Sequence, residues 1–262
     1  MNRTPATIAL PGDACRRNGR REQARVLLLH GFTGDRRDWS PWLAEAPAAI
    51  AIDLPGHGGS PDPTGDFGSE IERLLQAIPP SIDQLVGYSL GGRVALSLIT
   101  ADPDRFRGAT ILSAHPGLTC AEQRDLRRQA DRRWIALLRS QGIRAFVDAW
   151  ERQPLFATQT ALAPSLLADQ RARRLAQRAE GLASNLACFG LAEMPATWNA
   201  LRHWPGRLRW LVGARDARFA TIAAELQRQR PETELTRVPG VGHNLLLEAP
   251  SAMQTLCFDG AS

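Results

Sequence analysis

The amino-acid sequence predicts an α/β fold in which a mostly parallel central sheet carries helices on both faces. Short apolar runs, such as residues 26–29 and 109–112, alternate with longer segments of helical pattern and end in loops that contain glycine. Continuous apolar runs of this length are typical of parallel strands buried on both faces. With 262 residues, of which 44% are hydrophobic and 23% charged, the chain is long enough for one such domain with a sizeable insertion.

The first half of the chain contains five of the expected strands. Besides the two runs above, strands are expected at residues 48–53 and 84–86, and an edge strand at 8–10. The helices of this half are expected at 39–46, at 67–77 and from Arg93 onward. A proline pair at residues 79–80 ends the second of these helices.

The strand pattern stops at about residue 118. Charged helical patterns at 122–138, 143–150 and 165–183 follow, and strands resume at 208–212 and 234–238, with helices at 220–229 and 250–256. A helical segment between two strands of such a sheet predicts a cap over the carboxyl edge of the strands, where these sheets bind ligands. We therefore expect a core at 1–117, a helical cap insertion at 118–191 and a second core part at 192–262.

The charge of the chain comes from an unusual composition. The net charge is +5 and no lysine is present, which excludes a lysine Schiff-base mechanism. Two explanations of this charge are open. One is compositional bias in a chain rich in Ala, Arg, Leu and Pro. The other is that some arginines bind an anionic small molecule, which suits their planar guanidinium. Acidic residues interleave with the arginines, so we expect no nucleic-acid partner.

Cysteine usage and the start of the chain bear on localisation and cofactors. The four cysteines at 15, 120, 188 and 257 are scattered, so neither a metal site nor a disulfide framework is expected, and no cofactor is implied. No apolar run approaches the roughly 18–20 residues that span a bilayer. The first residues lack an apolar signal segment, and we expect a cytoplasmic protein without a membrane partner.

The pattern Gly-x-Ser-x-Gly at residues 87–91 is the most informative stretch. It follows an expected strand and precedes an expected helix, so it predicts a sharp turn that exposes Ser89. The flanking glycines fit because the backbones pass too closely for a Cβ atom. The amide of Leu90 then lies at a helix N-terminus, where it can hold an oxyanion. The pattern also occurs by chance, and its interpretation depends on partners elsewhere.

Two further loops follow expected strands. Residues 30–34, His-Gly-Phe-Thr-Gly, predict a bend that presents the Phe32 amide as a second oxyanion donor, although a plain strand-ending turn is the alternative. The glycine-rich loop at 53–60 matches neither a dinucleotide fingerprint nor a P-loop. We interpret it as a tight structural turn, in which His57 is a hydrogen-bonded loop residue rather than a catalyst.

Asp216 and His243 complete a possible catalytic triad. With Ser89 they stand in the order Ser, Asp, His, each just after an expected strand, which is the order of the α/β-hydrolase fold. His243 can take the serine proton, and Asp216 can fix the imidazole tautomer. Taken singly, Asp216 could be a turn cap and His243 a buried loop histidine. Together the three residues predict a triad.

In combination, several segments resemble one family. The chain is similar to the 2-succinyl-6-hydroxy-2,4-cyclohexadiene-1-carboxylate synthases of menaquinone biosynthesis, over about residues 25–250. Tyr-Ser-Leu-Gly-Gly-Arg at 88–93 and Gln-Pro-Leu-Phe at 153–156 are the discriminating motifs. The other matching segments are residues 31–34, 53–58, 113–118, 213–219 and 242–244, with Trp150.

The resemblance implies a carbon–oxygen lyase that eliminates pyruvate from an enolpyruvyl cyclohexene bearing several carboxylates. The triad would supply the base, and the Phe32 and Leu90 amides would hold an enolate oxygen. A small anionic polycarboxylate would be the only partner of a monomer or small homo-oligomer. The implied substrate-binding residues are Tyr88, Arg93, Arg127, Trp150, Arg178 and Arg218.

Each of these assignments has an alternative. Arg93 could form a structural ion pair, Arg127 and Arg178 could line solvated helix faces, and Trp150 could be a core residue. Residues 158–168 form a longer stretch than the family pattern, so the position of Arg178 depends on an inferred gap. The same triad would also serve a carboxylesterase or a carbon–carbon bond hydrolase, and a non-catalytic ligand receptor is a third alternative.

Overall fold

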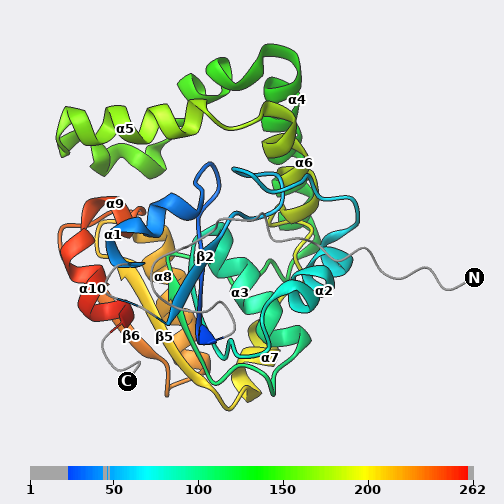
Figure 1. Ribbon diagram of the computed structural model, residues 1–262, viewed down its shortest axis with the longest axis vertical. Helices are drawn as coiled ribbons and strands as arrows, with labels where there is room; N and C mark the ends of the chain where they lie inside the picture. Colours follow the sequence, from blue (N-terminus) through cyan, green and yellow to red (C-terminus); the bar gives the residue numbers. More distant parts are fainter. Residues whose placement is uncertain (1–22, 44–45, 47, 259–262) are drawn as a thin grey trace, which may run out of the picture.

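The predicted parallel sheet is present. The computed structural model describes residues 23–43, 46 and 48–258 and contains a six-stranded sheet in the order β2-β1-β3-β4-β5-β6, in which every neighbouring pair is parallel (Figure 1). Leu29 pairs with Gly87, and Gly87 with Ile111, so β1, β3 and β4 end at one edge of the sheet. The strands are β1 (Val26–Leu29), β2 (Ala49–Ile52), β3 (Gln84–Tyr88), β4 (Gly108–Leu112), β5 (Arg207–Gly213) and β6 (Glu234–Val238).

Helices cover both faces of this sheet. One face packs against α2 (Phe67–Ala77), α3 (Leu90–Ala101), α7 (Trp198–His203) and α8 (Ala217–Gln229). The other face packs against the short α1 (Ser40–Leu43) with the 3₁₀ helix η2 (Arg36–Trp39), α9 (Leu245–Glu248) and α10 (Pro250–Phe258). Because successive side chains of a strand point to opposite faces, Leu27 and Leu29 belong to the first layer and Leu28 to the second.

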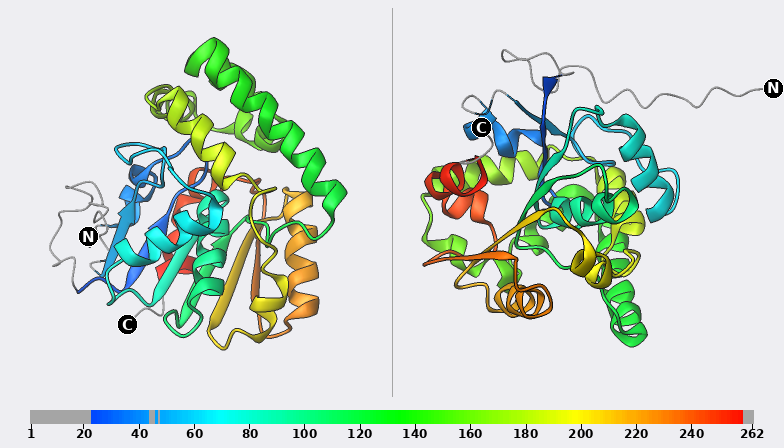
Figure 2. Two further views of the ribbon diagram at one scale, coloured as in Figure 1. Left: turned by 90° about the vertical axis from the view of Figure 1, so that its right-hand side faces the viewer. Right: turned by 90° about the horizontal axis from the view of Figure 1, so that it is seen from below.

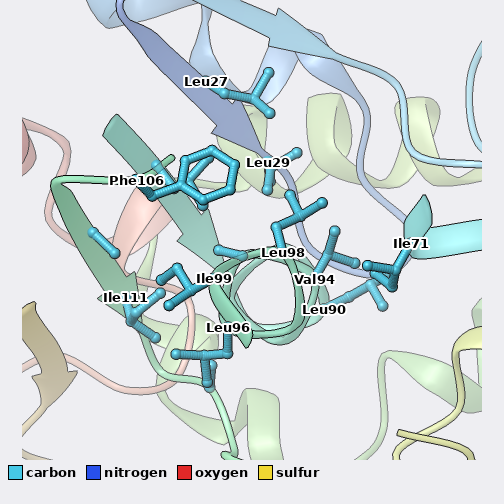
Figure 3. Close-up of a cluster of buried hydrophobic side chains, with 14 of the residues drawn as sticks. Leu27, Leu29, Ile71, Leu90, Val94, Leu96, Leu98, Ile99, Phe106 and Ile111 are labelled. Atoms are coloured by element: carbon cyan, nitrogen blue, oxygen red, sulfur yellow. The ribbon is translucent and has the colours of Figure 1, made fainter. Parts of the chain in front are cut away.

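Helix α3 is the centre of the larger core. Figure 3 shows Val94, Leu98 and Ile99 of α3 among side chains of β1 and β4, including Leu29 and Ile111, and all of these are almost completely buried. Burial of one such side chain contributes roughly 1.5–3 kcal/mol. The helix that begins directly after Ser89 is therefore firmly anchored in the core.

The expected helical cap is inserted between β4 and β5. It contains α4 (Ala121–Trp150), the 3₁₀ helix η3 (Pro154–Ala161), α5 (Pro164–Leu175) and α6 (Ala179–Phe189). In Figures 1 and 2, α4 and α5 lie beyond one end of the strands. A small apolar cluster that includes Leu138, Phe146 and Leu182 holds α4 and α6 together.

Several expected boundaries are corrected. The helices expected at 122–138 and 143–150 are both present within α4, on either side of a kink at Gly142, where φ is 76°. The single helix expected at 165–183 is divided at 176–178 into α5 and α6. The helix expected from Arg93 begins at Leu90, and η2 and α1 stand in place of the helix expected at 39–46. Residues 44, 45 and 47, just after α1, lie outside the described part. The edge strand expected at 8–10 and Cys15 lie outside it as well. Among the described residues, no helix is both long and apolar enough to cross a membrane.

Candidate active site

The turn between β3 and α3 is built on close backbone contacts. Ser89 has φ of 51°, in the left-handed region that non-glycine residues rarely adopt, at a cost of about 1–3 kcal/mol. A Cβ atom on Gly91 would overlap the Leu29 carbonyl, and one on Gly87 would overlap the Gly91 carbonyl. The first turn of α3 therefore lies directly on the end of β1, and the strained serine is held at the N-terminus of the helix.

The structure brings Ser89, His243 and Asp216 together. His243 Nδ1 lies 2.7 Å from Asp216 Oδ2, and His243 Nε2 lies 3.2 Å from Ser89 Oγ. With Asp216 ionised, Nδ1 donates to the carboxylate and Nε2 is free to accept the serine proton. His243 and Asp216 are 2% and 7% exposed, so water competes little for these bonds.

Asp216 has a second task that the sequence presented only as an alternative. Its Oδ1 accepts a hydrogen bond from the Phe219 amide and caps α8. The Phe219 ring lies 4.5 Å from the His243 imidazole, centroid to centroid. The same carboxylate therefore fixes the helix, and through Phe219 it fixes one side of the imidazole.

Glu248 holds the histidine loop, and it was not among the predicted site residues. Its Oε2 accepts from the Gly242 amide at 2.7 Å and its Oε1 from the Asn244 amide at 3.2 Å, on either side of His243. The acidic residue a few positions after the histidine is a signal that could have indicated this role. The backbone of His243 is bracketed by one carboxylate.

The loop after β1 forms a tight turn beside Ser89. The Gly34 amide donates to the Gly31 carbonyl at 3.0 Å, and Thr33 has φ of 69°. The Thr33 amide donates to His57 Nε2 at 3.3 Å. His57 is fully buried, and its burial keeps the pKa well below the ordinary value, so the imidazole stays neutral and accepts this bond. The interpretation of His57 as a loop-holding residue agrees with these contacts.

A cavity of about 300 Å³ opens between this turn and the cap. Ser89, His243 and Phe32 line it from the core, together with Tyr88, one of the predicted substrate-binding residues. Trp150, another of those residues, closes it from the cap. The remaining cap residues of the wall are Leu155, Phe156, Leu166, Gln170, Arg173 and Arg174.

The cap arginines of this cavity differ from those predicted. Arg174 is 5% exposed, donates to Glu151 at 3.1 Å and lies over the Phe156 ring. Together with Leu166, Gln170 and Arg173 it forms one face of α5, because residues three, four and seven positions apart share a helix face. This periodicity is the signal that could have found Arg173 and Arg174.

Arg178 does not reach the cavity, which corrects our prediction. It stands at the start of α6, and its side chain is 49% exposed. Its Nη2 donates to the Ser60 carbonyl at 3.0 Å and to Asp62 at 2.6 Å. The prediction depended on a gap inferred within residues 158–168, and Arg178 lies beyond the end of α5, four positions after Arg174, which lines the cavity.

The other predicted arginines gather around His115. The pKa of His115 is lowered to about 4, first by burial and then by the charges of Arg218, Arg93 and Arg127. His115 Nδ1 accepts from the Gly117 amide at 3.0 Å, so the neutral ring carries its proton on Nε2. These arginines do not line the cavity of 300 Å³.

The arginines beside His115 are only partly paired. Arg127 forms an ion pair with Asp131 at 2.9 Å, Arg93 donates to the Phe189 carbonyl at 2.6 Å and Arg218 lies over the Phe219 ring. Burial and the nearby Arg127 lower the pKa of Arg93 to about 9. Since Asp131 is the one acid that pairs with any of them in the described contacts, the group carries an excess of positive charge.

The fold and the site define the class of the protein. The family model of the alpha/beta hydrolase family matches residues 26–253. The chain is 35% identical over 239 residues to the 2-succinyl-6-hydroxy-2,4-cyclohexadiene-1-carboxylate synthase of Escherichia coli O1:K1 / APEC, with 87% of this chain and 90% of that protein covered. A putative synthase of the same description from Bacillus subtilis strain 168 is 31% identical over 86% of this chain and 85% of its own.

A solved structure agrees with these relatives. MenH from S. aureus superposes with a TM-score of 0.83 and 28% identity over 89% of this chain and 91% of that one. The chain thus belongs to the α/β-hydrolase family and, within it, to the 2-succinyl-6-hydroxy-2,4-cyclohexadiene-1-carboxylate synthase family. The resemblance stated from the sequence is confirmed.

Proposed function

We propose that this protein is a carbon–oxygen lyase of menaquinone biosynthesis. It eliminates pyruvate from 2-succinyl-5-enolpyruvyl-6-hydroxy-3-cyclohexene-1-carboxylate and forms 2-succinyl-6-hydroxy-2,4-cyclohexadiene-1-carboxylate. The observation that carries the proposal is the hydrogen-bonded Ser89–His243–Asp216 array beside a cavity whose wall contains the buried Arg174. The similarity to synthases over most of the chain supports this reaction over others of the fold.

The substrate and product define a 1,4-elimination. A proton leaves ring carbon 2, beside the succinyl ketone, and its electron pair forms an enolate. Return of that pair forms the C2–C3 double bond, the ring double bond moves to C4–C5, and the C5–O bond breaks. The departing enolpyruvate takes up a proton on carbon and becomes pyruvate, so that atoms and charges balance.

The triad acts as the base in this scheme. His243 Nε2 accepts the proton of Ser89 Oγ as that oxygen removes the proton from C2, and Asp216 stabilises the resulting imidazolium. The charge that develops is on the ketone oxygen, and the amides of Phe32 and Leu90 donate to it. Backbone amides at a helix N-terminus are suited to an enolate oxygen as well as to a tetrahedral intermediate.

Two groups of arginines support an anionic substrate. Arg173 and Arg174 are in the wall of the cavity, and Arg174 has no freedom to turn away, because Glu151 and Phe156 hold it. The excess positive charge near His115 offers a second position for a carboxylate. Guanidinium groups bind carboxylates with charge-assisted hydrogen bonds. A simple ester substrate would give no reason for this charge.

The deciding experiment compares two substrates with one enzyme stock. Pyruvate release from the enolpyruvyl cyclohexene is measured beside cleavage of a short-chain nitrophenyl ester. Fast pyruvate formation with feeble ester cleavage is expected. Ester cleavage without pyruvate would retain the triad but refute the lyase, and an enzyme that neither turns over nor reacts with a fluorophosphonate at Ser89 would be a ligand receptor.

A further inference from the structure

The junction between α5 and α6 joins the cap to two loops of the core. Gln177 lies in this junction and is 6% exposed. Its Oε1 accepts from the Gly58 amide at 2.9 Å, and its Nε2 donates to the Gly34 carbonyl at 3.1 Å. Because one partner is a backbone donor and the other a backbone acceptor, only one orientation of the amide satisfies both.

The surrounding contacts leave Gln177 little freedom. Asn185 Nδ2 donates to the Pro55 carbonyl at 2.8 Å, and Arg178 is bonded to Ser60. The backbones of Gly181 and Gly56 approach so closely that a Cβ atom on either would overlap the carbonyl oxygen of the other. The junction is therefore docked on the core loop that contains Gly58, and Gln177 extends this docking to Gly34.

Gly34 ends the turn that contains the Phe32 amide. His57 holds this turn from the core, through the Thr33 amide, and Gln177 holds it from the cap, through the Gly34 carbonyl. Thr33 adopts a left-handed conformation that favours glycine, so contacts from outside the turn add to its internal Gly34–Gly31 hydrogen bond in maintaining it. Gln177 is not among the residues that line the cavity, and it acts on the site through the turn.

We propose that Gln177 is a positioning residue that holds the Phe32 amide toward the developing oxyanion, so that docking of the cap and stabilisation of the enolate are linked. This inference rests on the proposed role of Phe32. It gives this cap residue a role in the site, because Gln177 donates a hydrogen bond to the backbone of the turn.

Gln177→Glu tests the donor side of this bridge with little change in shape. The carboxylate still accepts from the Gly58 amide, but it cannot donate to the Gly34 carbonyl and places an oxygen against it. We expect kcat to fall by about 10- to 100-fold, as for a small misplacement of a catalytic group, and less than the roughly 10²–10³-fold caused by deleting an oxyanion donor. KM is expected to stay within about twofold, since Gln177 lies outside the cavity.

Asn185→Ala is the matched control. It removes a buried hydrogen bond between the same cap and a core loop, but this bond ends on Pro55 and not on the turn at 31–34. We expect a lower melting temperature and a loss of kcat well below that of the Gln177 variants, because Gln177 keeps both of its own hydrogen bonds. Gln177→Ala, which removes both bonds of the bridge, is expected to lower kcat at least as much as Gln177→Glu.

A second measurement avoids the substrate altogether. The rate at which a fluorophosphonate labels Ser89 depends on the triad and the oxyanion amides, and it is expected to fall in both Gln177 variants in parallel with kcat. Labelling at the wild-type rate, or an equal loss in Asn185→Ala, would overturn the proposal. If the wild-type protein labels but releases no pyruvate, the lyase assignment fails, while the labelling rates still decide the role of Gln177.

Discussion

The loops of the core and the helices of the cap build the site by different physical means. In the core, Ser89 is fixed by backbone packed on backbone, with Gly91 against the end of β1. In the cap, Arg174 is fixed by side chains, through an ion pair with Glu151 and the Phe156 ring. Close backbone contacts hold Ser89 in one position. Side-chain contacts such as those of Arg174 can change when the contacting residues are substituted. In the proposed function, the reacting groups accordingly lie on the rigid part, and the arginine that binds the substrate lies on the adaptable part.

Removal of the nucleophilic oxygen is expected to have the largest effect on activity. Ser89→Ala should lower kcat by at least about 10⁴-fold, because the relay loses the group that takes the substrate proton. Binding of the product, measured by calorimetry, should persist because the arginines are intact. Substantial pyruvate release by this variant would remove the triad from the mechanism.

A test of the backbone contacts is Gly91→Ala. The added methyl group would overlap the Leu29 carbonyl, and we expect the free energy of unfolding to fall by about 2–4 kcal/mol. Gly68→Ala is the control, because a Cβ atom there would have Asp66 as its only neighbour within 4 Å, at 3.7 Å. In α2 this change should be neutral or stabilise the protein by about 0.5–1 kcal/mol. Equal chemical denaturation curves for the two variants would show that the turn between β3 and α3 tolerates a side chain at Gly91.

This difference between the regions also explains what could be predicted from the sequence. Steric requirements at Gly87 and Gly91 leave a recognisable pattern of residue types in the sequence. That pattern, with the chain order, was sufficient to predict that Ser89 and His243 lie close together. The site residues of α5 leave no such pattern, since Arg174 and Arg178 are the same residue type and only the helix phase separates them. Gln177 and Glu248 were missed because their tasks are hydrogen bonds to backbone groups, which no recognised motif indicates; the one available signal was the position of Glu248 a few residues after His243.

The two cap arginines offer a sharper comparison. Arg174→Met keeps the apolar stem but removes the charge from the cavity wall, and KM should rise by about 10- to 100-fold, the loss of a charge-assisted hydrogen bond. Glu151 keeps a partner, because Arg171 also pairs with it. Arg178→Met, outside the cavity, should leave KM within about twofold. Steady-state kinetics that show the larger KM for Arg178→Met would restore our first assignment.

The last expected effect concerns pH and His115. Its pKa is lowered from an ordinary 6.5 to about 4, so between these values the unfolded chain binds a proton that the folded protein does not. Stability is therefore complete above about pH 6.5 and decreases as the pH falls toward 4. His115→Asn removes the titrating ring, and its melting temperature should decline less steeply than that of the wild type across this window. Asn differs little in polarity, so the two curves should run parallel above pH 7. Parallel curves throughout would mean that neither burial nor the nearby arginines lower the pKa of His115 in the folded protein.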